Sequence, residues 1–420
     1  NTIILKEKLS FKIGSIIKDS KLSKSNSTIK VLYFEKLLNF IRALCLYIIS
    51  NNDLQQILTN WNIKKEGGCE NRIIESFIDL LFHFDILKLI DGKLALSKRY
   101  DRLLKNEKTK IQSLFKDQIV GANFKKPKLI IDFLFVKDLI NRYRNATYDF
   151  KHIKRNKKTW IEMIQDGTLD YEIRLAETLF EISRLKIPNK IKSPFTEDYY
   201  TESGRNAFKN FTQYKFIDVF TKIVEKRENI NVLDISCGYG NYIDVLNTNY
   251  PMFHILGIET QEKVFEFTNE KFKGTHNVDI LHGDFFNYPF QSQFDIILLN
   301  YVLFYFNRKE KSDLLAKAKQ VLSEDGSIIV CQYFANIENI KRDLAERQNE
   351  LSLSKQIEMF YSNKILYANT LWNDVADTFS ESVKWDEFLD IIAENNLKIN
   401  RITNADKFYY SLFIELTPNK

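Results

Sequence analysis

The chain has 420 residues, of which 28% are charged, 44% are apolar and 14% are aromatic. This apolar share excludes a disordered chain, and the length allows two or three domains with buried cores. Lys, Asn, Ile, Phe and Tyr are abundant beside only 13 Gly and 6 Pro, as an AT-rich genome produces. We therefore do not take the net charge of +6 as evidence for an anionic partner.

The cysteines indicate a reducing compartment. Cys45, Cys69, Cys237 and Cys331 are far apart and form neither a CxxC pair nor the framework of a secreted domain. The longest apolar run, residues 296–306, is shorter than the roughly 18 residues that a membrane helix needs, and no signal peptide is visible at the start. We expect a cytoplasmic protein that does not enter a membrane.

The first predicted elements, within residues 33–100, are three helices followed by a hairpin. Apolar residues recur at helical spacing in three successive stretches, and Asp91-Gly92 marks a tight turn. This order is typical of a winged-helix domain, which we interpret as a dimerisation module. DNA binding is disfavoured because the third helix is acidic and would repel the duplex. Its charged residues are Glu70, Arg72, Glu75, Asp79 and Asp85.

A basic stretch and further helices follow. Residues 101–160 carry 16 Lys or Arg against 6 Asp or Glu, which a solvated helical face explains. Helical patterns then continue to about residue 228. We expect three parts, which are a helical winged-helix-like dimerisation domain at 1–120, a helical connector at 121–204 and a ligand-binding domain at 205–420.

After residue 229 the pattern changes to short strand-like runs, with helical patterns between the earlier ones. Such alternation predicts an α/β fold with a Rossmann-like, doubly wound sheet of seven strands. Only six residues join the last two runs, so these should form an antiparallel hairpin at the sheet edge. The predicted strands are 229–235, 253–259, 278–284, 294–300, 326–334, 397–402 and 409–416.

The stretch NVLDISCGYGNY at residues 231–242 combines a strand, an acid and a glycine turn before a helix. Asp234 stands at the strand end, and Gly238 and Gly240 let the backbone approach a ligand at the helix N-terminus. The third glycine of a dinucleotide fingerprint is missing because Ile243 occupies its position, and the Lys of a P-loop is absent. The turn therefore indicates a nucleotide-like ligand without a pyrophosphate.

The next two strand ends carry matching groups. Glu259 follows the glycines by about 20 residues, the position from which a carboxylate accepts hydrogen bonds from both ribose hydroxyls. Asp284 and Phe285 follow the third strand, where an acid accepts from an adenine amino group and a ring covers the base. The order of these residues at successive strand ends predicts one shared site.

These motifs resemble those of the class I S-adenosylmethionine-dependent methyltransferases. VLDISCGYG is similar to their first motif, with Ser236 where glycine is usual, and GDFF and FDIILLNYVLFYF are similar to their adenine segment and fourth strand. More narrowly, residues 205–420 resemble the two-domain O-methyltransferases with an N-terminal winged-helix dimerisation domain. The resemblance is only architectural before residue 200.

The resemblance implies S-adenosylmethionine as cofactor and a division of roles at the strand ends. The first motif would hold the methionine portion, the acid after the second strand the ribose, and the segment after the third strand the adenine. The implied cofactor-binding residues are Asp234, Ser236, Gly238, Gly240, Glu259, Asp284, Phe285 and Asn300.

The chain departs from that family after the fourth strand. Plant-type members place a histidine general base there, but Phe304 stands at this position. No other histidine is an obvious substitute; the chain has His83, His152, His254, His276 and His282. We therefore leave the catalytic residue unassigned and expect simple phenols to be poor acceptors. Candidates for positioning the acceptor are Tyr301, Tyr305 and Tyr333.

We expect no metal site, because Asn300, Asn307 and Arg308 stand where a metal-dependent relative would have carboxylates. Residues 336–380 cap the acceptor pocket in the family that the chain resembles. Their aromatic side chains form either such a lid or ordinary core packing. The predicted pocket residues are Phe304, Met359, Tyr361 and Trp372.

The sequence thus predicts a homodimer that transfers a methyl group from S-adenosylmethionine to oxygen, carbon or nitrogen of a small molecule, in secondary metabolism. Two alternatives remain. The same fold can use the charged sulfonium to promote a rearrangement without methyl transfer, or the chain can be a winged-helix regulator or scaffold without catalysis. A nucleic-acid partner is not expected.

Overall fold

The computed structural model of the protein describes residues 44–64, 71–102, 181–196, 212–225, 227–349, 351–406 and 409–419, with positions 38, 41, 42, 104, 105, 178, 199, 204, 205 and 208. Several predictions lie outside these residues. They concern most of the basic stretch before residue 160, most of the connector, and the boundary at residue 120. The other boundary, at residue 204, stays a prediction.

The described N-terminal elements are helices followed by a hairpin. They are α3 (Leu54–Lys64), α4 (Arg72–His83), β1 (Leu87–Ile90) and β2 (Lys93–Leu96). Asn71 caps α4, because its side chain accepts hydrogen bonds from the first backbone N–H groups of the helix. Asp91 and Gly92 both have positive φ, 50° and 76°, as a two-residue hairpin turn requires. The predicted hairpin and its turn are confirmed.

A seven-stranded sheet forms the C-terminal part, in the order β5-β4-β3-β6-β7-β9-β8. The first five strands of that order are parallel, and β9 is antiparallel to both β7 and β8. The predicted fold class is confirmed, with β8 at the edge and β9 inside it. The strands are β3 (Asn231–Ile235), β4 (His254–Glu259), β5 (Val278–His282), β6 (Phe294–Asn300), β7 (Leu322–Tyr333), β8 (Leu397–Asn404) and β9 (Ser411–Pro418).

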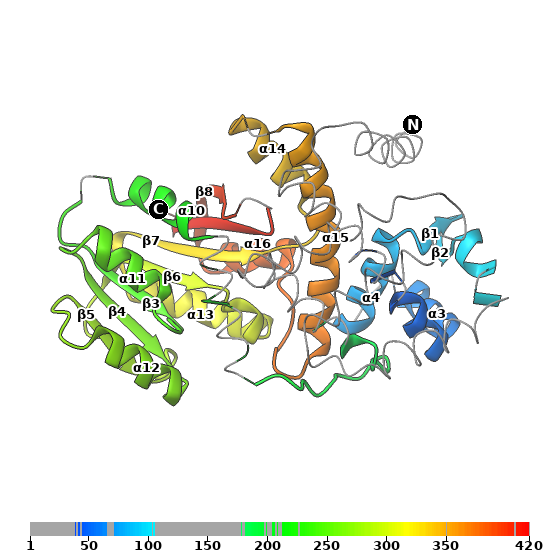
Figure 1. Cartoon of the computed structure of the whole chain (residues 1–420), viewed down its shortest axis with the longest axis horizontal. Helices are drawn as coiled ribbons and strands as arrows, with labels where there is room; N and C mark the ends of the chain where they lie inside the picture. Colours follow the sequence, from blue (N-terminus) through cyan, green and yellow to red (C-terminus); the bar gives the residue numbers. More distant parts are fainter. Residues whose placement is uncertain are drawn as a thin grey trace, which may run out of the picture.

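Helices cover both faces of the sheet, as a doubly wound fold requires (Figure 1). One apolar core joins the sheet to α10, α11 and α12, and a second joins its other face to α13, α15 and α16. The helices are α10 (Gln213–Val224), α11 (Asn241–Asn249), α12 (Glu262–Phe272), η4 (Leu303–Tyr305), α13 (Arg308–Gln320), α14 (Glu338–Arg347), α15 (Leu353–Val375) and α16 (Trp385–Glu394).

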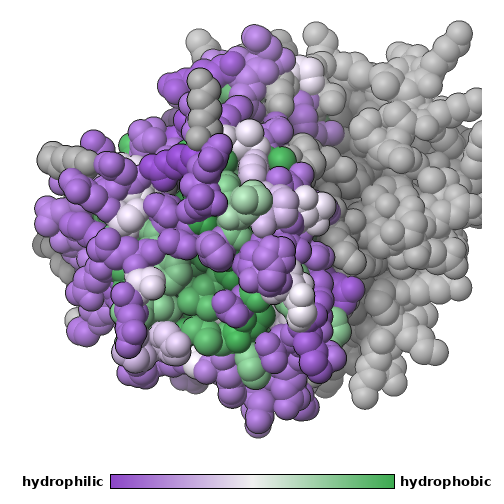
Figure 2. Space-filling view, turned by 90° about the vertical axis from the view of Figure 1, so that its left-hand side faces the viewer, coloured by the Kyte–Doolittle hydropathy of each residue, from purple (hydrophilic) through white to green (hydrophobic). Residues whose placement is uncertain are grey.

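Residues 283–293 connect β5 to β6 through a turn and irregular backbone, without a helix. Asp284 stabilises this turn by accepting the backbone N–H of Phe286 at 3.0 Å. Viewed from the β5 end, the surface is mainly hydrophilic and has one patch of hydrophobic residues in a hollow (Figure 2).

Helix α15 stands between the sheet and the N-terminal elements (Figure 1). It packs directly against α4, and buried side chains of both helices belong to one continuous apolar core that also contains residues of β6 and β7. Ile365, Leu366 and Leu371 of α15 are fully buried in it. The position of α15 is therefore fixed from two sides.

Five charged side chains meet where α4, α15, α13 and α16 come together. This junction cluster consists of Arg72, Lys311, Asp374, Glu381 and Glu387. Arg72 pairs with Glu387 and lies 3.4 Å from Glu381, and Lys311 lies 3.0 and 3.1 Å from the same two glutamates. Burial raises the pKa of Glu387, but attraction by Lys311 and Arg72 outweighs it and lowers the pKa. Glu387 is thus ionised, and the cluster joins four helices.

No helix among the described residues combines the length and the apolar character that crossing a bilayer requires.

Candidate active site

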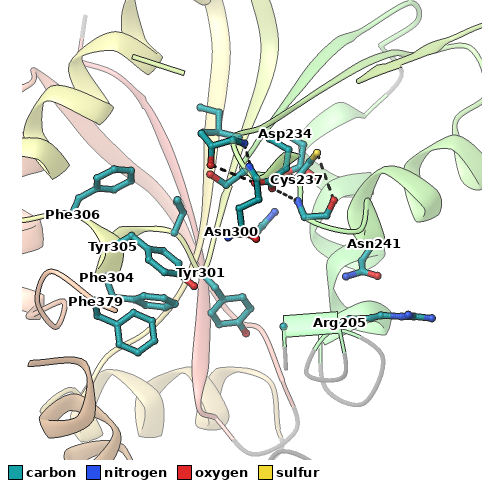
Figure 3. A pocket seen from close by; sticks show the side chains of 18 of the residues that line it. Arg205, Asp234, Cys237, Asn241, Asn300, Tyr301, Phe304, Tyr305, Phe306 and Phe379 are labelled. Atoms are coloured by element: carbon teal, nitrogen blue, oxygen red, sulfur yellow. Dashed lines mark hydrogen bonds between the residues drawn. The ribbon is translucent and has the colours of Figure 1, made fainter. Parts of the chain in front are cut away.

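A cavity of about 510 Å³ lies at the carboxyl ends of the parallel strands. The strand order reverses between β3 and β6, since β4 and β5 lie on one side of β3 and β6 and β7 on the other. Ligands of open α/β sheets bind at such a switch point. Figure 3 shows a polar half around Asp234 and Asn300 and an aromatic half around Phe304 and Phe379, with Tyr301 between them.

The turn after β3 has an unusual backbone. Ser236, Gly238 and Gly240 have φ values of 56°, 55° and 66°, in the region that favours glycine. A Cβ atom at Gly240 would lie 2.5 Å from Cε2 of Phe272, so a side chain there would force this ring to move. Thr268 Oγ1 donates to the Gly238 carbonyl at 2.7 Å and fixes the turn from α12. The positive φ at position 236 explains why glycine is usual there in the related family, where this chain has Ser236.

Glu259, at the end of β4, is buried and oriented by the backbone. Its carboxylate accepts hydrogen bonds from the N–H groups of Gly238, Thr260 and Gln261 at 2.9, 2.9 and 3.0 Å. A carboxylate has about four acceptor positions, so capacity remains for a ligand hydroxyl. The bond from Gly238 also links this acid to the glycine turn.

Asp234 and Asn300 end the adjacent strands β3 and β6. Burial raises the pKa of Asp234 to about 8, and the neighbouring charge of Glu259 adds to this rise. Asp234 Oδ2 and both side-chain polar atoms of Asn300 are buried without a hydrogen-bond partner among the described residues. Buried polar groups are rarely left unpaired, so these atoms fit a polar, positively charged portion of a ligand.

Asp284 and Phe285 line the same half of the cavity. Asp284 is exposed and also accepts from Asn287 Nδ2 at 2.6 Å, whereas Phe285 is buried. Lys317 Nζ donates to the Phe286 carbonyl at 2.6 Å and lies 5.3 Å from the centre of the Phe285 ring. Lys317 of α13 therefore holds this turn in place.

Aromatic rings form the other half of the cavity. Phe304 is buried and stacks on Tyr333 with ring centres 5.6 Å apart, while Phe379 meets it edge to face at 5.1 Å. No histidine is among the described lining residues. His282 is exposed, contacts the Thr260 carbonyl and stacks on a ring of α12 outside the cavity.

The three candidate tyrosines line the cavity in different environments. Burial raises the pKa of Tyr301, and its hydroxyl donates to Ser411 Oγ at 2.9 Å. The Tyr333 hydroxyl accepts from Asn373 Nδ2 at 2.8 Å. The Tyr305 side chain is 40% exposed. A raised pKa keeps Tyr301 protonated, so it can position an acceptor but is a poor base at neutral pH.

The family model of the methyltransferase domain matches residues 232–326, from β3 into β7. The chain carries a methyltransferase domain. An uncharacterized methyltransferase of Staphylococcus carnosus is 25% identical over 176 residues, which span 42% of this chain and 79% of that protein. A demethylmenaquinone methyltransferase of Staphylococcus saprophyticus is 28% identical over 158 residues, or 34% of this chain and 64% of that protein. The predicted class, an S-adenosylmethionine-dependent methyltransferase, is confirmed.

A solved structure extends the similarity in fold beyond the methyltransferase domain. It is the O-methyltransferase family 2 protein from Planctomyces limnophilus, crystallised with apigenin. The TM-score is 0.54 at 15% identity, and the match covers 92% of this chain and 95% of that one. At this identity the likeness concerns the fold alone, which is a sheet domain preceded by helices.

Most predicted site residues of the methyltransferase domain line the cavity. Three do not: Gly240 caps α11 and packs against Phe272, while Met359 and Tyr361 lie elsewhere on α15. Met359 packs with Ala345 in a separate small core, and Tyr361 is buried in the main core. The lining residues are Asp234, Ser236, Gly238, Glu259, Asp284, Phe285, Asn300, Tyr301, Phe304, Tyr305, Tyr333 and Trp372.

Several lining residues escaped sequence reasoning. Arg205 and Asn241 lie beside the polar half (Figure 3), and Asn369 and Asn373 lie one helical turn apart on α15. The asparagines had a signal, since they flank Trp372 at helical spacing. Arg205 had none, because it stands in an unremarkable amphipathic segment. In the described part of the chain, no three His, Cys, Asp or Glu side chains are grouped as metal ligands.

Proposed function

We propose that the protein methylates a small molecule with a flat ring system. One observation carries this proposal, which is that a single cavity joins the strand-end acids to a chamber of aromatic rings. Bound S-adenosylmethionine supplies a methyl group that its sulfonium has already activated. The protein must then align an acceptor with that methyl group and exclude water. Secondary metabolism, where acceptors of this kind occur, is the setting that we propose.

The polar half of the cavity supports a residue-by-residue proposal for the cofactor. Asp234 Oδ2 and the Asn300 amide, which have no partner among the described residues, would bind the charged methionine portion. Arg205 is the only Lys or Arg among the described lining residues, and we assign it to the methionine carboxylate. The free capacity of Glu259 suits the ribose hydroxyls. Asp284 and Phe285 would bind the adenine, as predicted, while Ser236 and Gly238 shape the turn.

The presence of Phe304 in place of a histidine restricts which acceptor molecules the protein can methylate. With no histidine among the described lining residues, a neutral phenol has no obvious base to take its proton. An acceptor that is already ionised, such as an enolate carbon or a carboxylate, or an uncharged amine needs none. The apigenin complex of the similarly folded P. limnophilus protein supports a flat molecule as ligand. We propose such a molecule with an acidic or nucleophilic position.

Calorimetry with S-adenosylmethionine and S-adenosylhomocysteine tests the cofactor site. We expect a Kd in the micromolar range for the wild type and a loss of at least tenfold for Asp234→Ala. The matched control is Asp313→Ala, which removes an exposed aspartate on α13 and should leave the affinity unchanged. No heat for the wild type, or equal affinity of the two variants, would contradict the proposal.

A screen of metabolites with a labelled methyl donor tests the acceptor. The expected outcome is transfer to an acidic or amine-bearing ring compound and slow transfer to simple phenols. Fast methylation of a catechol would contradict the role given to Phe304. The missing histidine also suits the alternative of a rearrangement without transfer. A product that forms only with S-adenosylmethionine present and carries no label would favour that alternative.

We also propose that the N-terminal elements form a homodimer interface. Phe82, Leu89 and Ile90 are large apolar side chains on α4 and β1 with exposed fractions of 41%, 56% and 44%. Large apolar side chains exposed to solvent are candidates for an interface. Light scattering should give the mass of a dimer for the wild type and of a monomer for Leu89→Glu with Ile90→Glu. A monomeric wild type would contradict this proposal.

A further inference from the structure

The face of α15 that lines the cavity carries three polar side chains. Asn369, Trp372 and Asn373 are spaced i, i+3 and i+4, so they project from one side of the helix. All three are nine-tenths buried or more, with exposed fractions of 9%, 2% and 2%. This side of α15 faces the chamber that contains Phe304 and Phe379.

Two N–H groups on this face have no acceptor among the described residues. Asn369 Nδ2 and Trp372 Nε1 are buried and donate to none of these residues, whereas Asn373 Nδ2 donates to the Tyr333 hydroxyl at 2.8 Å. An indole N–H can only donate, so Trp372 cannot be satisfied by another donor. Buried donors are rarely left unpaired. Their position on a cavity wall points to an acceptor atom in the ligand.

The surroundings define the chemistry of that atom. The single cation among the described lining residues, Arg205, lies in the polar half beside Asn241, away from Phe304 and Phe379 (Figure 3). A carboxylate next to α15 would therefore lack a counterion, whereas a neutral carbonyl oxygen accepts from two N–H groups at once. The rings of the chamber offer faces and edges to a flat molecule.

We propose that α15 recognises the acceptor molecule through a neutral carbonyl oxygen on a planar aromatic ring system, held by Asn369 and Trp372. This inference rests on the proposed methyltransferase function and names its substrate class. The helix is fixed independently of the ligand, because Asp374, the next residue after Asn373, belongs to the junction cluster and accepts from Ser382 N at 2.6 Å. The two donors are thus preorganised for binding.

Binding of a matched pair of flat compounds tests this proposal. 9-Fluorenone carries one carbonyl, and fluorene has the same ring skeleton without it. Calorimetry on the full chain, with and without saturating S-adenosylhomocysteine, should give tighter binding of fluorenone to the wild type. Asn369→Leu removes the side-chain amide and keeps most of its volume, whereas Trp372→Phe removes the indole N–H together with part of the ring. Each should weaken fluorenone binding about 3- to 10-fold, and Asn369→Leu should change fluorene binding less than twofold.

Stability provides a second measurement that a merely structural role would not reproduce. Because the Asn369 donor has no partner among the described residues, Asn369→Leu should leave the melting temperature unchanged or raise it. Trp372→Phe also leaves a cavity in the core and should lower it. Equal weakening of both compounds by Asn369→Leu, no preference of the wild type for fluorenone, or a melting temperature of Asn369→Leu lowered by several degrees would overturn the proposal. Binding of S-adenosylhomocysteine should be the same in both variants. Its absence in the wild type would refute the methyltransferase proposal separately, since fluorenone is also measured alone.

Discussion

Removing Arg72 from the junction cluster should destabilise the whole protein. Its guanidinium pairs with Glu387, lies 3.4 Å from Glu381 and 3.8 Å from Asp374, and donates to the Ser382 carbonyl at 2.6 Å. Arg72→Ala takes this cation away from the buried Asp374 and from the partly buried Glu381 and Glu387, of which only the two glutamates also pair with Lys311. Breaking a buried ion pair from one side costs about 3–5 kcal/mol. We expect about 3 kcal/mol, because the Arg72 side chain is 23% exposed.

Urea denaturation at pH 7, followed by circular dichroism, measures this loss. The matched control is Lys105→Ala, whose ion pair with Asp101 is 72% and 41% exposed and should contribute less than about 0.5 kcal/mol. Adding Glu387→Gln to Arg72→Ala removes one uncompensated charge and should restore part of the stability. If Arg72→Ala costs no more than Lys105→Ala, and Glu387→Gln restores nothing, the cluster does not join the helices as argued.

Three further predictions concern the end of β3 and the turn that follows it. Burial raises the pKa of Asp234 from 3.8 to about 8. The folded state therefore binds this proton more tightly than the unfolded state does. As pH rises from 4 to 8, the wild type should lose about 5 kcal/mol of stability relative to Asp234→Asn, at roughly 1.4 kcal/mol per pKa unit. Parallel stability curves of the two proteins would contradict this. Ser236→Gly should raise the free energy of unfolding by about 1 kcal/mol, because a side chain with positive φ is strained; an unchanged urea midpoint would argue against strain. Gly240→Ala should cost about 2 kcal/mol through contact with Phe272, and a fully stable variant would show that this ring moves aside.

The sequence contained enough information for the sheet and for one half of the site. Strands buried on both faces, such as β3, appear as short apolar runs, and the turn of Asp91 and Gly92 follows from the backbone freedom of those residues. The acids at the strand ends could be placed because parallel strands bring their carboxyl ends together. Glu259 and Asp234 are therefore neighbours in the structure, although 25 positions separate them in the chain.

The aromatic half was harder to predict. Helix α15 buries side chains on several sides, so helical spacing alone does not distinguish residues of the core from residues of the cavity wall. Tyr361 and Trp372 are both buried aromatic residues of this helix, but only Trp372 lines the cavity. The side that faces the cavity depends on how α4 packs, which is a contact between distant segments.

The shared core of α4 and α15 bears on how this enzyme can be divided or recombined. A helix that shares its core both with α4 and with the sheet cannot be exchanged together with only one of them. Transplanting the sheet domain alone would expose the buried apolar side chains that α15 presents to α4 and would leave Asp374 without Arg72. Chimaeras with related methyltransferases should therefore take α4 and α15 from the same parent protein. We expect the acceptor preference of a chimaera to follow the parent that supplies these two helices.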